Sequence, residues 1–202
     1  MKEHILNYLP GDHPWQNHIW WFETLPSTNT RAKEMAAEGA PHGTVLIADS
    51  QTGGRGRMGR RFHSPAGSGT YLSVILRPEC PAAELMHLTC ATGAAMCDAV
   101  ESACGIRPGI KWTNDLVSGK RKLGGILTEL GLTPRGMVDY AIIGIGINCN
   151  QSAADFPQEL QSMAASLSMV LGKEIDMAQL EAALIRSLLA ISQDNKATML
   201  ER

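Results

Sequence analysis

Short apolar runs, separated by glycine-rich or polar turns, dominate the first three-quarters of the chain. Their shortness and their content of β-branched side chains are typical of buried strands. The turn sequence Thr133-Pro134-Arg135-Gly136 joins the last two runs and predicts a hairpin there. We therefore predict strands at residues 19–23, 44–49, 70–76, 110–114, 122–130 and 139–147.

Helix signals lie between and after these runs. Ser27-Thr28-Asn29 supplies the short oxygen-bearing side chains of a helix N-cap and Gly39 a typical end, so a helix is predicted at residues 30–38. A longer helix is predicted at about residues 84–103, and helices should dominate after Phe156, the last at residues 178–192. Consecutive strands with few inserted helices indicate an α+β fold, in which helices cover a mixed or antiparallel sheet. A doubly wound parallel sheet fits this order less well.

Size and charge limit the function. The 202 residues are 44% hydrophobic, which suits one compact domain over residues 1–202. The net charge of -2 provides no basic field for nucleic acid, so no DNA partner is expected. No apolar run approaches the roughly 20 residues of a membrane span, and the N-terminus does not resemble a signal peptide. We therefore predict a cytoplasmic protein without a membrane partner.

The cysteines and histidines argue against a structural metal site. Cys90, Cys97 and Cys104 recur every seven residues in the longer predicted helix, about 10 Å apart along its axis, which is too far to share an ion. The histidines have no ligand spacing either. We predict no structural zinc and interpret these cysteines as buried thiols in a reducing compartment.

A glycine- and arginine-rich segment at residues 53–61 is the sharpest chemical feature, with four residues of each type. Glycine loses the most entropy on ordering and neighbouring arginines repel each other, so an anionic ligand would supply the missing attraction. Gly54, Gly56 and Gly59 also satisfy the GxGxxG pattern of a dinucleotide-binding turn. That turn opens a helix, however, and this segment continues into Ser64-Pro65, which disfavours one. A solvated basic surface loop is the simpler alternative.

A second segment combines Lys111-Trp112-Thr113-Asn114-Asp115-Leu116 with the strand that begins near Lys122. Lysines and an Asn-Asp pair among apolar residues place polar groups at the rim of a sheet, where phosphates and a cation can be held together. Gly124 and Gly125 weaken a strand unless something approaches its backbone closely. We therefore interpret this segment as functional.

A third segment, Ile143-Gly144-Ile145-Gly146-Ile147-Asn148, has glycine at alternate positions. One face of this strand therefore lacks side chains, which leaves room for a flat ligand or for a packed helix. Asn148 would present two donors and an acceptor at the strand end. Packing explains this pattern as well as ligand binding does.

Together these segments resemble the catalytic domain of biotin protein ligases, which has a class II synthetase-like fold. The family pattern combines a Ser-Thr-Asn segment, a glutamine before a GRGRxGR loop, KWPNDL, RKLxGIL and a strand ending in GIGxN. All are found in this order from Ser27 to Asn148. Phe62 stands where the family usually has tryptophan, and Thr113 where it usually has proline.

The resemblance also sets expectations for the chain ends. The family normally continues into a small C-terminal β-barrel domain, which we expect to be absent or truncated in a chain that ends at Arg202. Some relatives carry an N-terminal helix-turn-helix that binds DNA. The 26 residues before Ser27 are too few for that domain, so regulation through DNA is not expected.

The resemblance implies a ligase that uses ATP and Mg²⁺ to convert biotin into biotinyl-5'-AMP. It then passes the biotinyl group to a lysine of a biotin carboxyl carrier protein, which the family places in acetyl-CoA carboxylase. The implied biotin contacts are Ser27, Thr28, Asn29, Gln51, Gly54, Arg55, Gly56, Arg57, Lys122, Gly124 and Gly125. The implied nucleotide contacts are Arg57, Arg60, Phe62, Lys111, Asn114 and Asn148, and the implied catalytic residues are Lys122, Arg57, Lys111 and Asp115.

This chemistry explains the residue types. Biotin's carboxylate and the α-phosphate of ATP are both anions, so arginines and lysines are needed to bring them together. Asn114 and Asp115 are the candidates for the magnesium neighbourhood, and Asp115 is the candidate for accepting the proton of the carrier lysine. A lipoate protein ligase of the same fold is the alternative, and a catalytically inert biotin-binding module is disfavoured by Lys111 and Lys122. A free sheet edge leaves both a monomer and a homodimer open.

Overall fold

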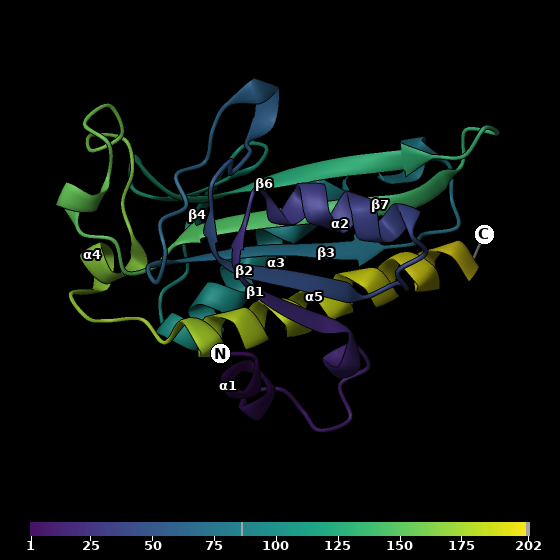
Figure 1. Cartoon of the computed structure of the whole chain (residues 1–202), viewed down its shortest axis with the longest axis horizontal. Coiled ribbons are helices and arrows are strands. Elements are labelled where there is room, and N and C mark those ends of the chain that lie inside the picture. The colour runs from purple at the N-terminus through teal and green to yellow at the C-terminus, as the bar shows by residue number, and fades with distance from the viewer. Residues whose placement is uncertain (86, 201–202) are drawn as a thin grey trace.

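A seven-stranded mixed sheet forms the centre of the computed structural model, which describes residues 1–85 and 87–200 (Figure 1). The first two strands are parallel, and every other neighbouring pair is antiparallel. The strand order is β1 (Ile19–Leu25), β2 (Thr44–Gln51), β3 (Gly69–Leu76), β7 (Val138–Asn148), β6 (Arg121–Leu132), β5 (Asp115–Ser118) and β4 (Gly109–Lys111). The predicted α+β class is confirmed.

Helices cover both faces of this sheet. They are α1 (Lys2–Asn7), α2 (Thr28–Ala37), α3 (Leu88–Cys104), α4 (Leu167–Leu171) and α5 (Met177–Leu200), with short 3-10 turns at Gln16–His18, Arg57–Gly59, Ala82–Leu85 and Ala153–Asp155. Helix α2 lies on one face, and α3 and α5 lie side by side on the other (Figure 1). No helix in the described part of the chain combines the length and apolar composition that a membrane span requires.

The central strands are apolar on both faces, which is why they read as continuous hydrophobic runs. Leu46, Ile75 and Ile142 pack against α2. The neighbouring residues Val45 and Val74 belong to the larger core beneath α3 and α5. The strand segments that carry the candidate chemistry are therefore fixed by packing from both sides.

Several predicted boundaries are wrong. Helix α2 begins at Thr28 with Ser27 at its N-cap, earlier than expected. The range 84–103 contains the end of a 3-10 turn and then α3, which begins only at Leu88. The range after Phe156 consists largely of turns as far as α4. Among the cysteines predicted to be buried, Cys90 is only half-buried, and all five are free thiols.

The predicted strand 110–114 is wrong beyond Lys111. β4 ends at Lys111, residues 112–114 form a turn, and the chain returns antiparallel as β5, with Lys111 opposite Asp115. Asparagine and aspartate favour such turns because their side chains compete for backbone hydrogen bonds. The hairpin predicted between β6 and β7 is confirmed, and Thr133 donates its backbone N–H to the carbonyl of Met137 at 2.8 Å.

Candidate active site

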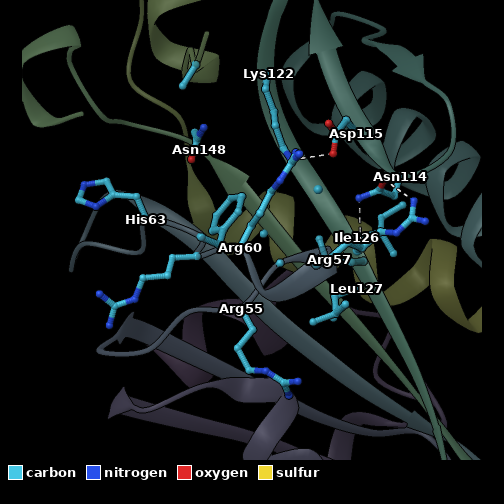
Figure 2. Close-up of a pocket in the computed structure, with 18 of the residues that line it drawn as sticks. Arg55, Arg57, Arg60, His63, Asn114, Asp115, Lys122, Ile126, Leu127 and Asn148 are labelled. Carbon is cyan, nitrogen blue, oxygen red and sulfur yellow. Dashed lines mark hydrogen bonds and ion pairs between the residues drawn. The ribbon is translucent and has the colours of Figure 1, made fainter. Parts of the chain in front are cut away.

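A cavity of about 710 Å³ lies over one end of the sheet, a size typical of small-ligand sites. The three segments singled out in the sequence, together with the start of α2, converge on it (Figure 2). The predicted site residues in its lining are Ser27, Thr28, Asn29, Gln51, Arg55, Gly56, Arg57, Arg60, Phe62, Lys111, Asn114, Asp115, Lys122, Gly125 and Asn148.

Two predicted residues, Gly54 and Gly124, do not line the cavity. A Cβ at Gly54 would collide with the carbonyl of Phe62, and one at Gly124 would press against the carbonyl of Gly146. The close approach that these glycines permit is therefore made by the protein's own backbone.

Several lining residues were not predicted. They form an apolar wall and additional basic positions, namely Met58, Arg61, His63, Val117, Lys120, Ile126, Leu127, Gly144, Ile145, Gly146, Phe156, Leu160, Met163 and Ala164. Part of this set lies within the segments singled out in the sequence: Met58 and Arg61 in the segment 53–61, Ile126 and Leu127 after Gly125, and Gly144 to Gly146 among the alternate glycines of β7. The segment 156–164 carries no polar motif that could have indicated a site.

Buried neutral polar groups form the floor of the cavity. Gln51 Oε1 accepts hydrogen bonds from the backbone N–H and from the hydroxyl of Thr28, at 2.8 and 3.2 Å. Ser73 Oγ lies 2.8 Å from Thr28 Oγ1 and 2.7 Å from Asn29 Oδ1. Gln51 Nε2 in turn lies 3.0 Å from Ser64 Oγ. Because a buried polar group without a partner costs about 1 to 3 kcal/mol, this network fixes the orientation of each side chain.

The alternate glycines of β7 make room for residues of the site. A Cβ at Gly144 would collide with the side-chain amide of Asn29, and a Cβ at Gly146 would lie 2.6 Å from the Phe62 ring. The Phe62 ring also contacts Tyr71 edge-on, with centroids 6.3 Å apart. At Gly144 the packed-helix explanation is confirmed, because Asn29 belongs to helix α2; at Gly146 the space is taken by the Phe62 ring. Both glycines also line the cavity, so ligand binding stays a prediction.

Glu129 on β6 links the cavity floor to the glycine- and arginine-rich residues 53–61, which we call the basic loop. Its carboxylate accepts hydrogen bonds from Asn29 Nδ2 at 2.9 Å and from both terminal nitrogens of Arg55 at 3.1 Å, and it pairs with Lys33. Burial raises the pKa of Glu129, and hydrogen bonds from Lys33 and Asn29 lower it. The charges of Lys33 and Arg55 act in the same direction, so the pKa lies below its ordinary value.

Arg55 therefore points away from Lys122 in this structure, as Figure 2 shows. Arg57 lies closer to the second segment, and its guanidinium donates to Thr113 Oγ1 at 2.6 Å and to Asn114 Oδ1 at 2.9 Å. The loop is thus attached to opposite sides of the cavity by two arginines.

Lys122 and Asp115 form an ion pair at the cavity, with Nζ and Oδ1 2.6 Å apart (Figure 2). Their positions follow from the pairing of β5 with β6. Asp115 is the single acidic residue among the described lining residues, which include four arginines and three lysines. The site is therefore strongly basic, although the chain as a whole has a net charge of -2.

Residues 21–148 match the Biotin/lipoate A/B protein ligase family. The chain belongs to this family. It is 45% identical over 161 residues to the bifunctional ligase/repressor BirA of Bacillus subtilis, a match covering 80% of this chain and 49% of that protein. It is 36% identical over 146 residues to the biotin–[acetyl-CoA-carboxylase] ligase of Mycobacterium tuberculosis, covering 70% of this chain and 51% of that protein. The chain thus spans about half the length of these curated relatives.

Solved structures of biotin protein ligases share the fold. The Aquifex aeolicus enzyme in complex with biotin and ATP superimposes with a TM-score of 0.75 at 32% identity, covering 87% of this chain and 70% of that one. The Leishmania major enzyme in complex with biotinyl-5-AMP gives a TM-score of 0.74 at 26% identity, covering 88% and 75%.

One side of the cavity is bounded by a short segment, residues 163–165, which we call the strap and which runs parallel beside the start of β6. Lys122 donates its backbone N–H to the carbonyl of Met163 at 2.7 Å and accepts from the N–H of Ala165 at 2.9 Å. Asn148 holds the same strap through a 3.1 Å hydrogen bond from Nδ2 to the carbonyl of Ala165. The position of Lys122 is therefore set by backbone pairing on the strap side as well as within the sheet.

Proposed function

We propose that this chain is the catalytic domain of a biotin protein ligase. It joins biotin to ATP as biotinyl-5'-AMP and transfers the biotinyl group to a lysine of a biotin carboxyl carrier protein. The observation that carries this proposal is one cavity in which a neutral hydrogen-bonding floor, a basic loop and the Lys122–Asp115 pair meet. The names of the relatives supply biotin, ATP and acetyl-CoA carboxylase as the substrate classes.

In the first step, an oxygen of the biotin carboxylate attacks the α-phosphorus of ATP. The bond from this phosphorus to the bridging oxygen breaks, and pyrophosphate leaves with the bonding electrons. Lys122 neutralises charge between the carboxylate and the α-phosphate, and Arg57 and Lys111 hold the phosphates. Arg60 is a further phosphate contact on the loop.

The two ends of the cavity suit the two ends of the adenylate. Ser27, Thr28, Asn29 and Gln51 offer neutral partners to the ureido ring of biotin, whose N–H and C=O groups need them when buried. The lining also contains Phe62, Phe156 and Met163, whose apolar surface suits adenine, and Asn148 as a polar partner.

The side chains of the cavity suit Mg²⁺ only when the ion is also bound by the phosphates of ATP. The described residues contain no group of three or more histidine, cysteine, aspartate or glutamate side chains that could hold an ion. Asp115, with Asn114 beside it, offers the one carboxylate that ATP-bound Mg²⁺ commonly uses in addition to phosphate oxygens and water. The ion would supply charge neutralisation at the phosphates.

In the second step, the unprotonated amine of the carrier lysine attacks the acyl carbon of biotinyl-5'-AMP. An amide bond forms, the bond from the acyl carbon to the phosphate oxygen breaks, and AMP leaves with the bonding electrons. A lysine with a pKa near 10.4 is almost wholly protonated at pH 7, so a proton acceptor is needed. Asp115 is the carboxylate in position to take that proton or to attract the incoming ammonium group.

A cytoplasmic location is part of the proposal. The five cysteines are free thiols, and four of them are buried in the core. Free thiols persist in a reducing compartment, which is where a carboxylase that consumes ATP also operates.

The proposed function is tested by measuring pyrophosphate release with ATP and Mg²⁺ in the presence of either biotin or lipoate. We expect release that requires biotin and does not occur with lipoate, followed by biotinylation of an added carrier domain. Release with lipoate instead would identify a lipoate ligase, and binding of biotin without release from ATP would identify a binding module.

Replacing Arg57 by glycine is expected to increase leakage of the adenylate. The substitution removes the 2.6 and 2.9 Å hydrogen bonds that attach the loop to Thr113 and Asn114, and a hydrogen bond to a charged group contributes about 1.5 to 3 kcal/mol. Biotinylation of an added bystander protein should therefore rise about tenfold. Arg135→Gly, in the exposed β6–β7 turn, is the control, and equal labelling by both variants would contradict a retaining role for Arg57.

A further inference from the structure

Three large apolar side chains are exposed at the mouth of the cavity. Met58, at the tip of the basic loop, is 89% exposed, Trp112 in the β4–β5 turn is 78% exposed, and Met163 in the strap is 56% exposed. Tryptophan is normally well buried, and grouped exposed apolar side chains indicate an interaction surface. We call these three residues the apolar rim.

Two of the three segments that carry the apolar rim contact each other, and the third pairs with the start of β6. Met58 and Trp112 are the sequence neighbours of Arg57 and Thr113, whose side chains are hydrogen-bonded at 2.6 Å. The carbonyl of Met163 accepts the backbone N–H of Lys122 at 2.7 Å. The rim therefore surrounds the entrance to the Lys122–Asp115 pair.

Trp112 is not part of the cavity. It is absent from the lining, whereas its neighbours Lys111 and Asn114 belong to it. Small substrates held inside the cavity thus do not account for its exposure. Something larger than biotin or ATP, approaching from outside, would cover it.

The surroundings of the rim are basic. The stretch from Gly109 to Lys122 contains four lysine or arginine residues and one acidic residue, Asp115, in a chain whose net charge is -2. Lys120 in the β5–β6 turn and Arg121, the first residue of β6, are exposed. A partner that covers the rim must therefore tolerate or prefer positive charge, which favours an acidic protein surface.

We propose that the apolar rim, with Lys120 and Arg121, is the docking surface for the carrier domain, and that this partner presents acidic side chains around its acceptor lysine. The inference rests on the proposed function. The acceptor lysine must enter beside Asp115, so the surface surrounding this entrance is the one that the carrier covers. Exposed tryptophan and methionine are residue types enriched in such interfaces.

The test separates docking from chemistry. In Trp112→Ala, we expect biotin-dependent pyrophosphate release and acyl transfer to hydroxylamine to stay within twofold of the unsubstituted chain. The KM for a biotin carrier domain of acetyl-CoA carboxylase should rise about tenfold or more, as for loss of a central interface tryptophan. Trp20→Ala is the matched control, because Trp20 is 52% exposed on β1, at the other edge of the sheet.

A charge-reversal variant tests whether the carrier presents acidic side chains to Lys120 and Arg121. Arg121→Glu should also raise the KM for the carrier, and added salt should weaken carrier use by the unsubstituted chain more than by this variant. Arg121→Glu should not alter pyrophosphate release at a fixed salt concentration, because Arg121 does not line the cavity.

Three results would overturn the proposal. An unchanged carrier KM in Trp112→Ala would show that the rim does not dock the carrier. A change in sedimentation of Trp112→Ala without a change in carrier KM would show that the rim joins two copies of this chain. Absence of biotin-dependent pyrophosphate release in the unsubstituted chain would instead refute the proposed function itself, and with it the carrier as occupant.

Discussion

Replacing Lys122 by alanine is expected to lower the rate of biotin-dependent pyrophosphate release by about a thousandfold. Removal of one preorganised charge or donor from a developing transition state commonly costs two to three orders of magnitude. Lys122 is in addition the ion-pair partner of Asp115, so its loss leaves a carboxylate without that partner in a site that must attract two anions. The effect should fall on the rate constant of the chemical step more than on the affinity for biotin.

The measurement is steady-state pyrophosphate release together with equilibrium binding of biotin. Lys173→Ala is the matched control, because Lys173 is exposed and lies between α4 and α5. Thermal unfolding of both variants distinguishes loss of chemistry from loss of fold. A Lys122→Ala variant that keeps more than about a tenth of the rate would exclude this residue as the main charge between the reacting groups.

Replacing Glu181 by glutamine is expected to stabilise the protein at neutral pH. Glu181 is 5% exposed on α5, and its Oε2 has no hydrogen-bond partner among the described residues. Burial raises the pKa of its carboxyl to about 8, despite an opposing hydrogen bond from Thr70. The carboxyl is thus protonated in the folded chain at pH 7 and ionised in the unfolded chain.

The protonated carboxyl of Glu181 makes the free energy of unfolding depend on pH. Because the folded state binds this proton more tightly than the unfolded state, the stability that the proton contributes is fully present below about pH 4.5 and is lost as pH rises towards 8. At pH 7 the unfolded chain gains about 3 kcal/mol by ionising, and the glutamine variant removes most of this advantage.

Urea unfolding at pH 5 and pH 8 measures this effect. The free energy of unfolding of Glu181→Gln should exceed that of the unsubstituted chain more at pH 8 than at pH 5. Glu174→Gln is the control, because Glu174 is exposed just before the same helix. Equal pH profiles for Glu181→Gln and the unsubstituted chain would show that this carboxyl is not held protonated.

Much of the fold could be predicted because its strands are buried on both faces. Continuous apolar runs such as β2 and β3 and the turn before Gly136 carry local signals that tertiary packing did not override. β5 was missed because its four residues lack a distinctive pattern, and the turn at 112–114 divides a run that resembles one strand.

The candidate site could be located from sequence only where its residues carry an unusual pattern. The clustered glycines and arginines and the Asn-Asp pair do, and the structure brings them to one cavity. The supporting residues Ser73 and Glu129 could not be found, because each is one polar residue in a strand. Each matters because it binds Asn29, which lies 44 positions from Ser73 and 100 positions from Glu129 along the chain. The roles of the individual site residues stay predictions until the variants are measured.

The contact between Asn29 and Gly144 constrains how the family can diverge at this site. Helix α2 and strand β7 meet here with no spare volume, since the amide of Asn29 occupies the place of a side chain at 144. A larger residue at 144 requires a smaller one at 29, and that change also removes the hydrogen bonds to Ser73 and Glu129. A side chain at 144 therefore cannot be accommodated by a change at that position alone, and we expect it to require a compensating substitution at 29.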